Sequence, residues 1–221
     1  MKLFLQIFFI FTLLFSQYCQ ATIIFINEIH YDNSGSDDNE FIEVFGEANL
    51  DLNGWSIALY NGSNGTVYQT LTLSGKILNE SNGFGAVSFD FSGIQNGSPD
   101  GVALIDNEGE LRQFLSYEGS FTATEGAALG EKSIDIGIHE PTNTPKGLSL
   151  QLKGNGREFN DFTWDLAKHS KGLINATQVA APLTKISAPN ITLLLLIALL
   201  FLMYRQPKLL EQNIHIRLVN Q

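Results

Sequence analysis

Between residues 22 and 179, short runs of β-branched and aromatic residues alternate with clusters of Gly, Asn, Asp and Ser. Such runs are typical of β-strands, and the clusters between them are typical of turns. No segment of this region sustains an apolar period of about 3.6 residues over the roughly ten positions that a helix needs. The predicted strands are 23–29, 41–45, 55–60, 66–73, 86–91, 102–106, 111–117, 148–152 and 159–166.

Alternation within these runs predicts two distinct faces. Side chains of a strand point alternately to its two sides, so Ile42 and Val44 should lie on one face and Glu43 on the other. Many short strands without helices between them favour one antiparallel β-sandwich or barrel over residues 22–179. Turns are predicted where Asn and Gly, which tolerate positive φ angles, gather, at 61–65, 106–109 and 153–157.

The first 21 residues have the composition of a secretory signal peptide. Met1 and Lys2 give a positive start, residues 3–15 (LFLQIFFIFTLLF) carry no charge, and residues 19–21 (CQA) have the small residues of a cleavage site. The apolar run is shorter than the roughly 20 residues of a membrane span. We therefore predict a signal peptide at 1–21 and export of the chain.

Residues 186–204 (ISAPNITLLLLIALLFLMY) form a second uncharged stretch. As a helix rising about 1.5 Å per residue, it would approach the roughly 30 Å hydrocarbon thickness of a bilayer. Arg205 and Lys208 follow it, and basic residues favour the cytoplasmic side. We predict a linker at 180–185, a transmembrane or sorting helix at 186–204 and a short cytoplasmic tail at 205–221.

Cysteine content and charge restrict the chemistry of the mature domain. Cleavage after Ala21 would remove Cys19, the only cysteine, and with it any disulfide or thiol nucleophile. Region 22–179 holds 8 Lys and Arg against 22 Asp and Glu, a net charge of −14. Nucleic acids are bound by cationic surfaces, so this charge disfavours a nucleic-acid partner. It is compatible with divalent cations or with a soluble, self-repelling exterior.

A series of short motifs follows in order along residues 22–178. The motifs are I-N-E-I-H-Y-D-N (26–33), E-F-I-E-V (40–44), D-L-N-G-W-S-I-A-L-Y-N-G (51–62), G-I-Q-N-G-S-P-D-G-V-A-L-I-D (93–106), F-L-S-Y-E-G-S-F-T-A (114–123), S-L-Q-L-K-G-N-G (149–156) and D-F-T-W (161–164). Together they resemble the lamin tail domain in its bacterial exported form. The resemblance implies an immunoglobulin-like β-sandwich and a binding or scaffolding function. Because such domains often accompany exported nucleases or phosphatases, an accessory role in an exported hydrolase or nuclease system is the alternative.

The C-terminal region carries a second resemblance. Ser187, Ala188 and Pro189, then the apolar run and Arg205, are similar to the PEP-CTERM sorting tail in its Ser-Ala-Pro form. The chain departs from that pattern in its thin basic cluster and in the 16 residues after Arg205. The similarity implies processing by an exosortase-type system during surface delivery, and a plain membrane anchor is the alternative.

Several motif residues also have plain structural explanations. We expect Trp55 to anchor the core where a turn enters a strand. Asn27 and Glu28 are expected to form hydrogen bonds at a turn or strand edge rather than to act in catalysis. Core positions are also predicted for Phe41, Phe114, Leu150 and Trp164.

No catalytic spacing stands out along the chain, so we predict that the protein is not an enzyme. The G-x-S-x-G nucleophile elbow and the phosphate-cradling glycine pattern are missing from the sequence. Metalloprotease spacing is also missing among the four histidines, His30, His139, His169 and His215.

The loop at 32–40 (DNSGSDDNE) is the best local candidate for a metal site. Calcium takes six to eight oxygen ligands, and such loops supply them from carboxylates and backbone carbonyls. We predict a weak calcium site and no other cofactor, and an exposed acidic hairpin loop is the alternative. The predicted ligands are Asp32, Asp37, Asp38 and Glu40.

These observations favour a non-catalytic binding or scaffolding module on an exported chain. It would be held at the inner membrane by the C-terminal helix, with the domain in the periplasm, or reach the cell surface or extracellular matrix after tail processing. Its partner would be a protein or an extracellular polysaccharide. A binding module should show an exposed aromatic or apolar patch on a sheet face, whereas an enzyme needs a pocket of histidines and carboxylates.

Overall fold

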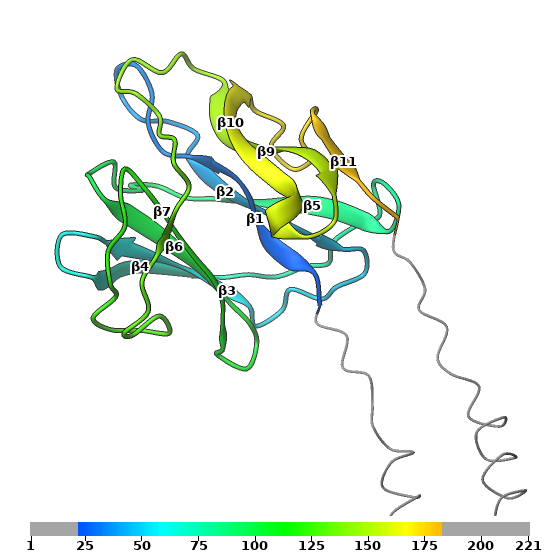
Figure 1. Ribbon diagram of the computed structural model, residues 1–221, viewed down its shortest axis with the longest axis horizontal. Coiled ribbons are helices and arrows are strands. Elements are labelled where there is room, and N and C mark those ends of the chain that lie inside the picture. The colour runs from blue at the N-terminus through cyan, green and yellow to red at the C-terminus, as the bar shows by residue number, and fades with distance from the viewer. Residues whose placement is uncertain (1–21, 183–221) are drawn as a thin grey trace, which may run out of the picture. The chain divides into compact units, whose positions relative to one another are not determined.

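The computed structural model describes residues 22–182, and these residues form an all-β fold of two sheets (Figure 1). The predicted signal peptide, apolar helix and tail, at 1–21, 186–204 and 205–221, lie outside the described residues. The described strands are β1 (Ile24–His30), β2 (Phe41–Glu47), β3 (Ser56–Asn61), β4 (Thr66–Thr72), β5 (Phe84–Asp90), β6 (Asp100–Ile105), β7 (Leu111–Tyr117), β8 (Ile134–Asp135), β9 (Leu148–Gly156), β10 (Phe162–Lys168) and β11 (Gln178–Ala180), with a 3-10 turn, η1 (Phe159–Asp161), before β10.

The strands are divided between a six-stranded and a five-stranded sheet. The first has the order β10-β9-β1-β2-β5, with β11 also paired to β9, and the second has the order β4-β3-β6-β7-β8. Most neighbours are antiparallel, as expected, but β11 on β9 and β8 on β7 run parallel. The prediction of a purely antiparallel arrangement was wrong for these two short strands. The segments that precede β8 and β11 turn the chain so that each short strand runs in the same direction as the strand it pairs with.

The nine predicted strands all appear, and the two short strands β8 and β11 were missed. Two and three residues long, they are too short to show alternation. The predicted turn at 153–157 was also wrong, because β9 continues to Gly156 and the chain turns at η1. A Cβ at Gly156 would lie 2.1 Å from Cβ of Asp161, so this glycine permits a close approach rather than a turn.

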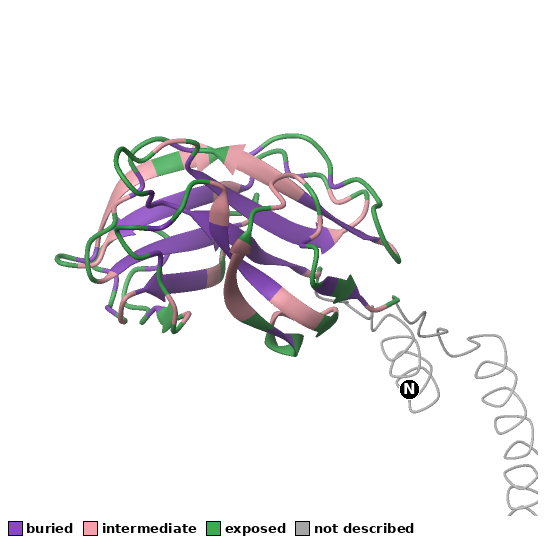
Figure 2. Cartoon of the chain, turned by 90° about the horizontal axis from the view of Figure 1, so that it is seen from above, coloured by how far each residue is buried: buried purple, intermediate pink, exposed green. Residues whose placement is uncertain are grey.

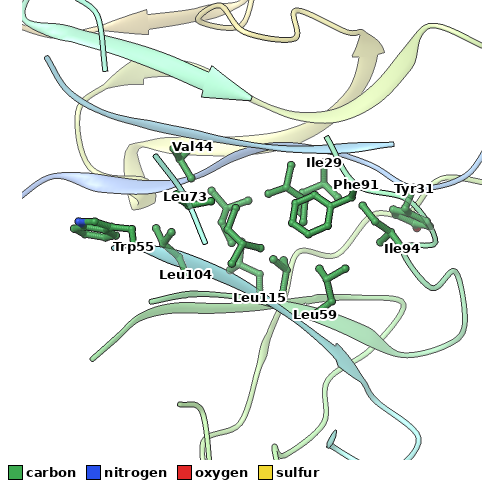
Figure 3. Close-up of a cluster of buried hydrophobic side chains, with 14 of the residues drawn as sticks. Ile29, Tyr31, Val44, Trp55, Leu59, Leu73, Phe91, Ile94, Leu104 and Leu115 are labelled. Atoms are coloured by element: carbon green, nitrogen blue, oxygen red, sulfur yellow. The ribbon is translucent and has the colours of Figure 1, made fainter. Parts of the chain in front are cut away.

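The main hydrophobic cluster lies between the two sheets, as Figure 3 shows. Ile42 and Val44 both belong to it, which confirms the predicted face of β2. Trp55 is 5 % exposed and packs in the same cluster, as the sequence predicted. The two sheets and this shared core make the described region a β-sandwich.

The outer face of each sheet is also buried, which the alternating pattern did not predict. On the six-stranded sheet a second cluster includes Phe25, Phe45 and Phe84. On the five-stranded sheet a third cluster includes Tyr60 and Phe114, and the segment after β7 covers it with apolar side chains. Figure 2 shows the strands mostly buried and the exposed residues gathered mostly in the connections.

Candidate functional site

The predicted calcium ligands lie in the β1–β2 connection, and two of them, Glu40 and Asp38, contact other parts of the chain. The Glu40 side chain accepts the backbone N–H groups of Gly93 at 2.5 Å and Ile94 at 2.9 Å, so it anchors a distant loop. Asp38 lies 2.5 Å from the ammonium group of Lys146, and the hydrogen bond from Lys146, together with its charge, holds the pKa of Asp38 below its usual value.

The other two predicted ligands differ from each other in exposure. Asp32 is buried, and burial raises the pKa of its carboxyl, with a further rise from the charge of Asp37. Asp37 is exposed, and its carboxylate accepts the backbone N–H of Asn33 at 3.0 Å. Within residues 22–182, no group of three or more His, Cys, Asp or Glu side chains is placed to hold a metal ion.

Calcium binding at this loop therefore stays a prediction, which a melting experiment tests. If Asp32, Asp37, Asp38 and Glu40 gather around calcium, millimolar calcium raises the melting temperature of the full chain, because a ligand that binds only the folded state stabilises it. Magnesium at the same concentration is the control, since it prefers a rigid octahedral site. An unchanged melting temperature in calcium would contradict the site.

A buried histidine–carboxylate pair lies next to this loop. Nδ1 of His30, at the end of β1, lies 2.8 Å from Oε1 of Glu140. The other carboxylate oxygen accepts the backbone N–H groups of Tyr31 at 2.7 Å and Asp32 at 2.8 Å. The side chains of His30 and Glu140 are 4 % and 0 % exposed. Glu140 therefore fixes the path of the chain as it leaves β1.

The surrounding hydrogen bonds assign the proton on His30. The side-chain oxygen of Asn33 accepts the backbone N–H of Asp38 at 2.9 Å, so its amide nitrogen faces Nε2 of His30, at 3.0 Å, and donates to it. In the neutral ring the proton therefore lies on Nδ1 and is donated to Glu140. Burial lowers the pKa of His30, but the hydrogen bond and charge of Glu140 outweigh burial and raise it overall.

Two further carboxylates face each other on the outer face of the six-stranded sheet. Glu28 of β1 and Glu43 of β2 are register partners, and both are fully buried. Glu43 accepts hydrogen bonds from the Asn27 amide at 3.0 Å and the Gly172 backbone at 2.6 Å, and Glu28 accepts one from the Ser149 hydroxyl at 2.5 Å. Asn27 and Glu28 do form hydrogen bonds, but inside a central strand at a register shift rather than at a turn or edge.

Glu43 makes stability depend on pH. Burial, followed by the charge of Glu28, raises the pKa of Glu43 to about 8. The folded chain then keeps a proton that the unfolded chain releases above about pH 4.5. Between these values the free energy of unfolding should fall with rising pH, by up to about 1.4 kcal/mol per unit from this group.

Denaturant unfolding from pH 4.5 to 8 measures this slope. In Glu43→Gln the slope should be smaller, because the titrating group is gone, even though an amide nitrogen facing a donor lowers stability at every pH. The matched variant Glu108→Gln changes an exposed carboxylate and should keep the wild-type slope. An identical slope in Glu43→Gln and wild type would show that Glu43 is ionised in the folded chain throughout this range.

In contrast to these buried networks, an open groove of about 480 Å³ lies at one flank of the sandwich. Its walls come from the start of β1, from β7, from β8 and the residues before it, and from η1 and the residue before it. We call this feature the β1 groove and define it by Ile24, Arg112, Lys132, Ile134, Glu158 and Phe159. The volume lies within the range of ligand sites in proteins, about 300–1,000 Å³.

The β1 groove follows a stretch of β1 that has a strand on one side only. β9 pairs with β1 only at Glu28 and Ile29 of β1. Further along β9, the side of β9 that faced β1 pairs with β11 instead. The Asn175 side chain lies at the divide, where its amide donates to the backbone oxygens of Asn27 and of Leu152. Among residues 22–182, the first half of β1 therefore has β2 as its only ladder partner.

A side chain from the opposite sheet occupies part of this unpaired edge. The side-chain oxygen of Gln113, on β7, accepts the backbone N–H of Ile26 at 2.7 Å. That N–H therefore points away from β2. Ile24, two residues earlier in an uninterrupted register, points its N–H and C=O the same way, because alternate residues of an antiparallel pair face opposite sides.

The large exposed apolar side chains in the described region are all aliphatic. Of the large hydrophobic residues between 22 and 182, those that remain exposed are Leu78, Leu129, Ile134, Leu173 and Val179. Of these, Ile134 lines the β1 groove. Much of both outer sheet faces, where an aromatic or apolar patch was expected, is covered, and the β1 groove is a concave surface open to a partner.

Comparisons with known proteins add no further constraint. No protein-family model, no curated protein and no solved structure matches the chain. Within residues 22–182 the structure contains no helix of the length and apolarity that a membrane crossing requires.

Proposed function

We propose that this chain is an exported, membrane-tethered or surface-displayed binding module of lamin-tail type, with an immunoglobulin-like sandwich. The observation that carries the proposal is the β1 groove, an open site with unpaired strand edge and mixed charge on an otherwise acidic domain. Support also comes from the ordered motifs and from the uncharged segments at 1–21 and 186–204. The His30–Glu140 pair is covered and holds backbone, which is a structural role.

Cross-linking in intact cells tests whether the β1 groove meets a partner. A photoreactive amino acid at Ile134, 58 % exposed in the groove, should give an adduct with a protein or polysaccharide outside the cytoplasm. The matched position is Val179, 55 % exposed on β11, where no adduct is expected. Equal labelling at both positions, or none at Ile134, would contradict the proposed binding function.

A further inference from the structure

The unpaired edge of β1 specifies what the β1 groove binds. We propose that the groove takes an extended peptide segment of a partner protein, which adds as a strand to the edge of β1 at Ile24 and Ile26. This inference rests on the proposed binding function and names the chemical class of its partner. In strand addition, main-chain hydrogen bonds supply affinity, and pockets for alternate side chains supply selectivity.

The hydrogen-bonding groups in the groove match a peptide backbone. Ile24 points both its N–H and its C=O out from the edge, a donor and an acceptor on one residue, as a neighbouring strand requires. At Ile26 the Gln113 side chain already accepts the N–H, as the carbonyl of an added strand would. An incoming strand therefore competes with one side-chain amide, which can swing away on its flexible stem.

The shape of the groove selects a single strand over a second folded domain. The edge of β1 is recessed between Ile134 on one wall and Phe159 on another. A folded partner cannot bring a sheet edge within hydrogen-bonding distance of a recessed edge, whereas one extended chain can enter. Ile134 and Phe159 also offer apolar contacts for alternate side chains of the added strand.

Charge points to a peptide of low net charge. The domain carries −14 over residues 22–179, which repels a second copy and any strongly acidic segment. In the groove, Arg112 and Lys132 balance Glu131 and Glu158, so the local lining is neutral. A neutral extended segment therefore meets the least repulsion here.

Binding of a defined peptide to the full chain in lipid nanodiscs tests the inference. The probe is acetyl-Thr-Val-Thr-Val-Thr-Val-amide, uncharged so that the acidic surface does not attract it, and empty nanodiscs measure its partition into lipid. Saturating peptide should slow hydrogen exchange at the Ile24 amide by about tenfold, because that N–H becomes hydrogen-bonded. The same peptide N-methylated at alternate residues cannot form the ladder and should leave the exchange unchanged.

Two variants of the groove should change the affinity for the peptide in opposite directions, which separates effects on binding from defects in folding. Gln113→Ala removes the competitor for the Ile26 N–H and should tighten peptide binding by about fivefold, roughly the contribution of one hydrogen bond. Ile24→Pro removes the outward N–H donor and should abolish binding. Gln69→Ala makes the same substitution on β4, an edge strand of the other sheet, and should leave the affinity unchanged.

Two results would overturn the inference. One is no binding of the probe at millimolar concentration by wild type and Gln113→Ala; the other is slowed exchange on β4 (Thr66–Thr72) instead of β1. Either result combined with a specific adduct at Ile134 in cells would leave the binding function standing and show that the partner is not an extended peptide. If the probe peptide does not bind and Ile134 gives no specific adduct in cells, the proposed binding function is removed as well.

Discussion

Replacing Glu140 with Ala is expected to lower the free energy of unfolding by about 3–5 kcal/mol, the range found when one partner of a buried charged pair is removed. The substitution leaves Nδ1 of His30 and the N–H groups of Tyr31 and Asp32 without their acceptor, all in a buried site. Unsatisfied buried groups of this kind each carry a desolvation cost. Denaturant unfolding of the full chain measures the loss.

Two further variants test whether the lost hydrogen bonds of Glu140 cause the loss of stability. Glu108→Ala removes an exposed carboxylate and should change the free energy of unfolding by less than about 0.5 kcal/mol. Glu140→Gln keeps an oxygen for the backbone N–H groups, so its free energy of unfolding should lie between those of wild type and Glu140→Ala. If Glu140→Ala is as stable as Glu108→Ala, the Glu140 network does not hold the end of β1.

The second large effect is expected at Phe45, on the outer face of the six-stranded sheet. Phe45 is fully buried, and its ring centroid lies 5.1 Å from that of Phe25 and 5.1 Å from that of Phe84. Phe45→Ala should lower the free energy of unfolding by about 3–5 kcal/mol, because it removes a large apolar side chain and leaves a cavity.

The control for Phe45→Ala is the same substitution at a large apolar residue on the surface. Leu129 is 66 % exposed, so Leu129→Ala should cost less than about 0.5 kcal/mol in the same unfolding experiment. A loss below about 1 kcal/mol for Phe45→Ala would mean that the outer face is not part of the core, and that the segments covering it detach easily.

The sequence predicted the strands well because their signal is local. Alternation in β2 separates Val44 from Phe45, and the structure places these residues in different clusters. Hairpin turns such as 61–65 also depend on neighbouring residues alone, and they appear where the Asn and Gly pattern puts them. In contrast, alternation could not show that both faces of a sheet are covered, because the covering segments come from distant parts of the chain.

The candidate site was harder to predict because its parts are far apart in the sequence. His30 and Glu140 are 110 residues apart, and no motif marks Glu140 as its partner. Gln113 meets Ile26 across 87 residues, through the packing of one sheet on the other. The carboxylates of the 32–40 loop were visible in the sequence, but their individual partners, such as Lys146 for Asp38, depend on the tertiary fold.

The mass of the mature protein in membrane, medium and matrix fractions shows whether the chain is exported and displayed from a membrane, as we propose. If the chain is exported as proposed, the mature form begins at Thr22 and is found outside the cytoplasm. Retention of Gln221 in the membrane would identify a plain anchor, and a released form ending near Pro189 would identify a sorting signal. A full-length chain that begins at Met1 and is recovered with the cytosol would contradict export.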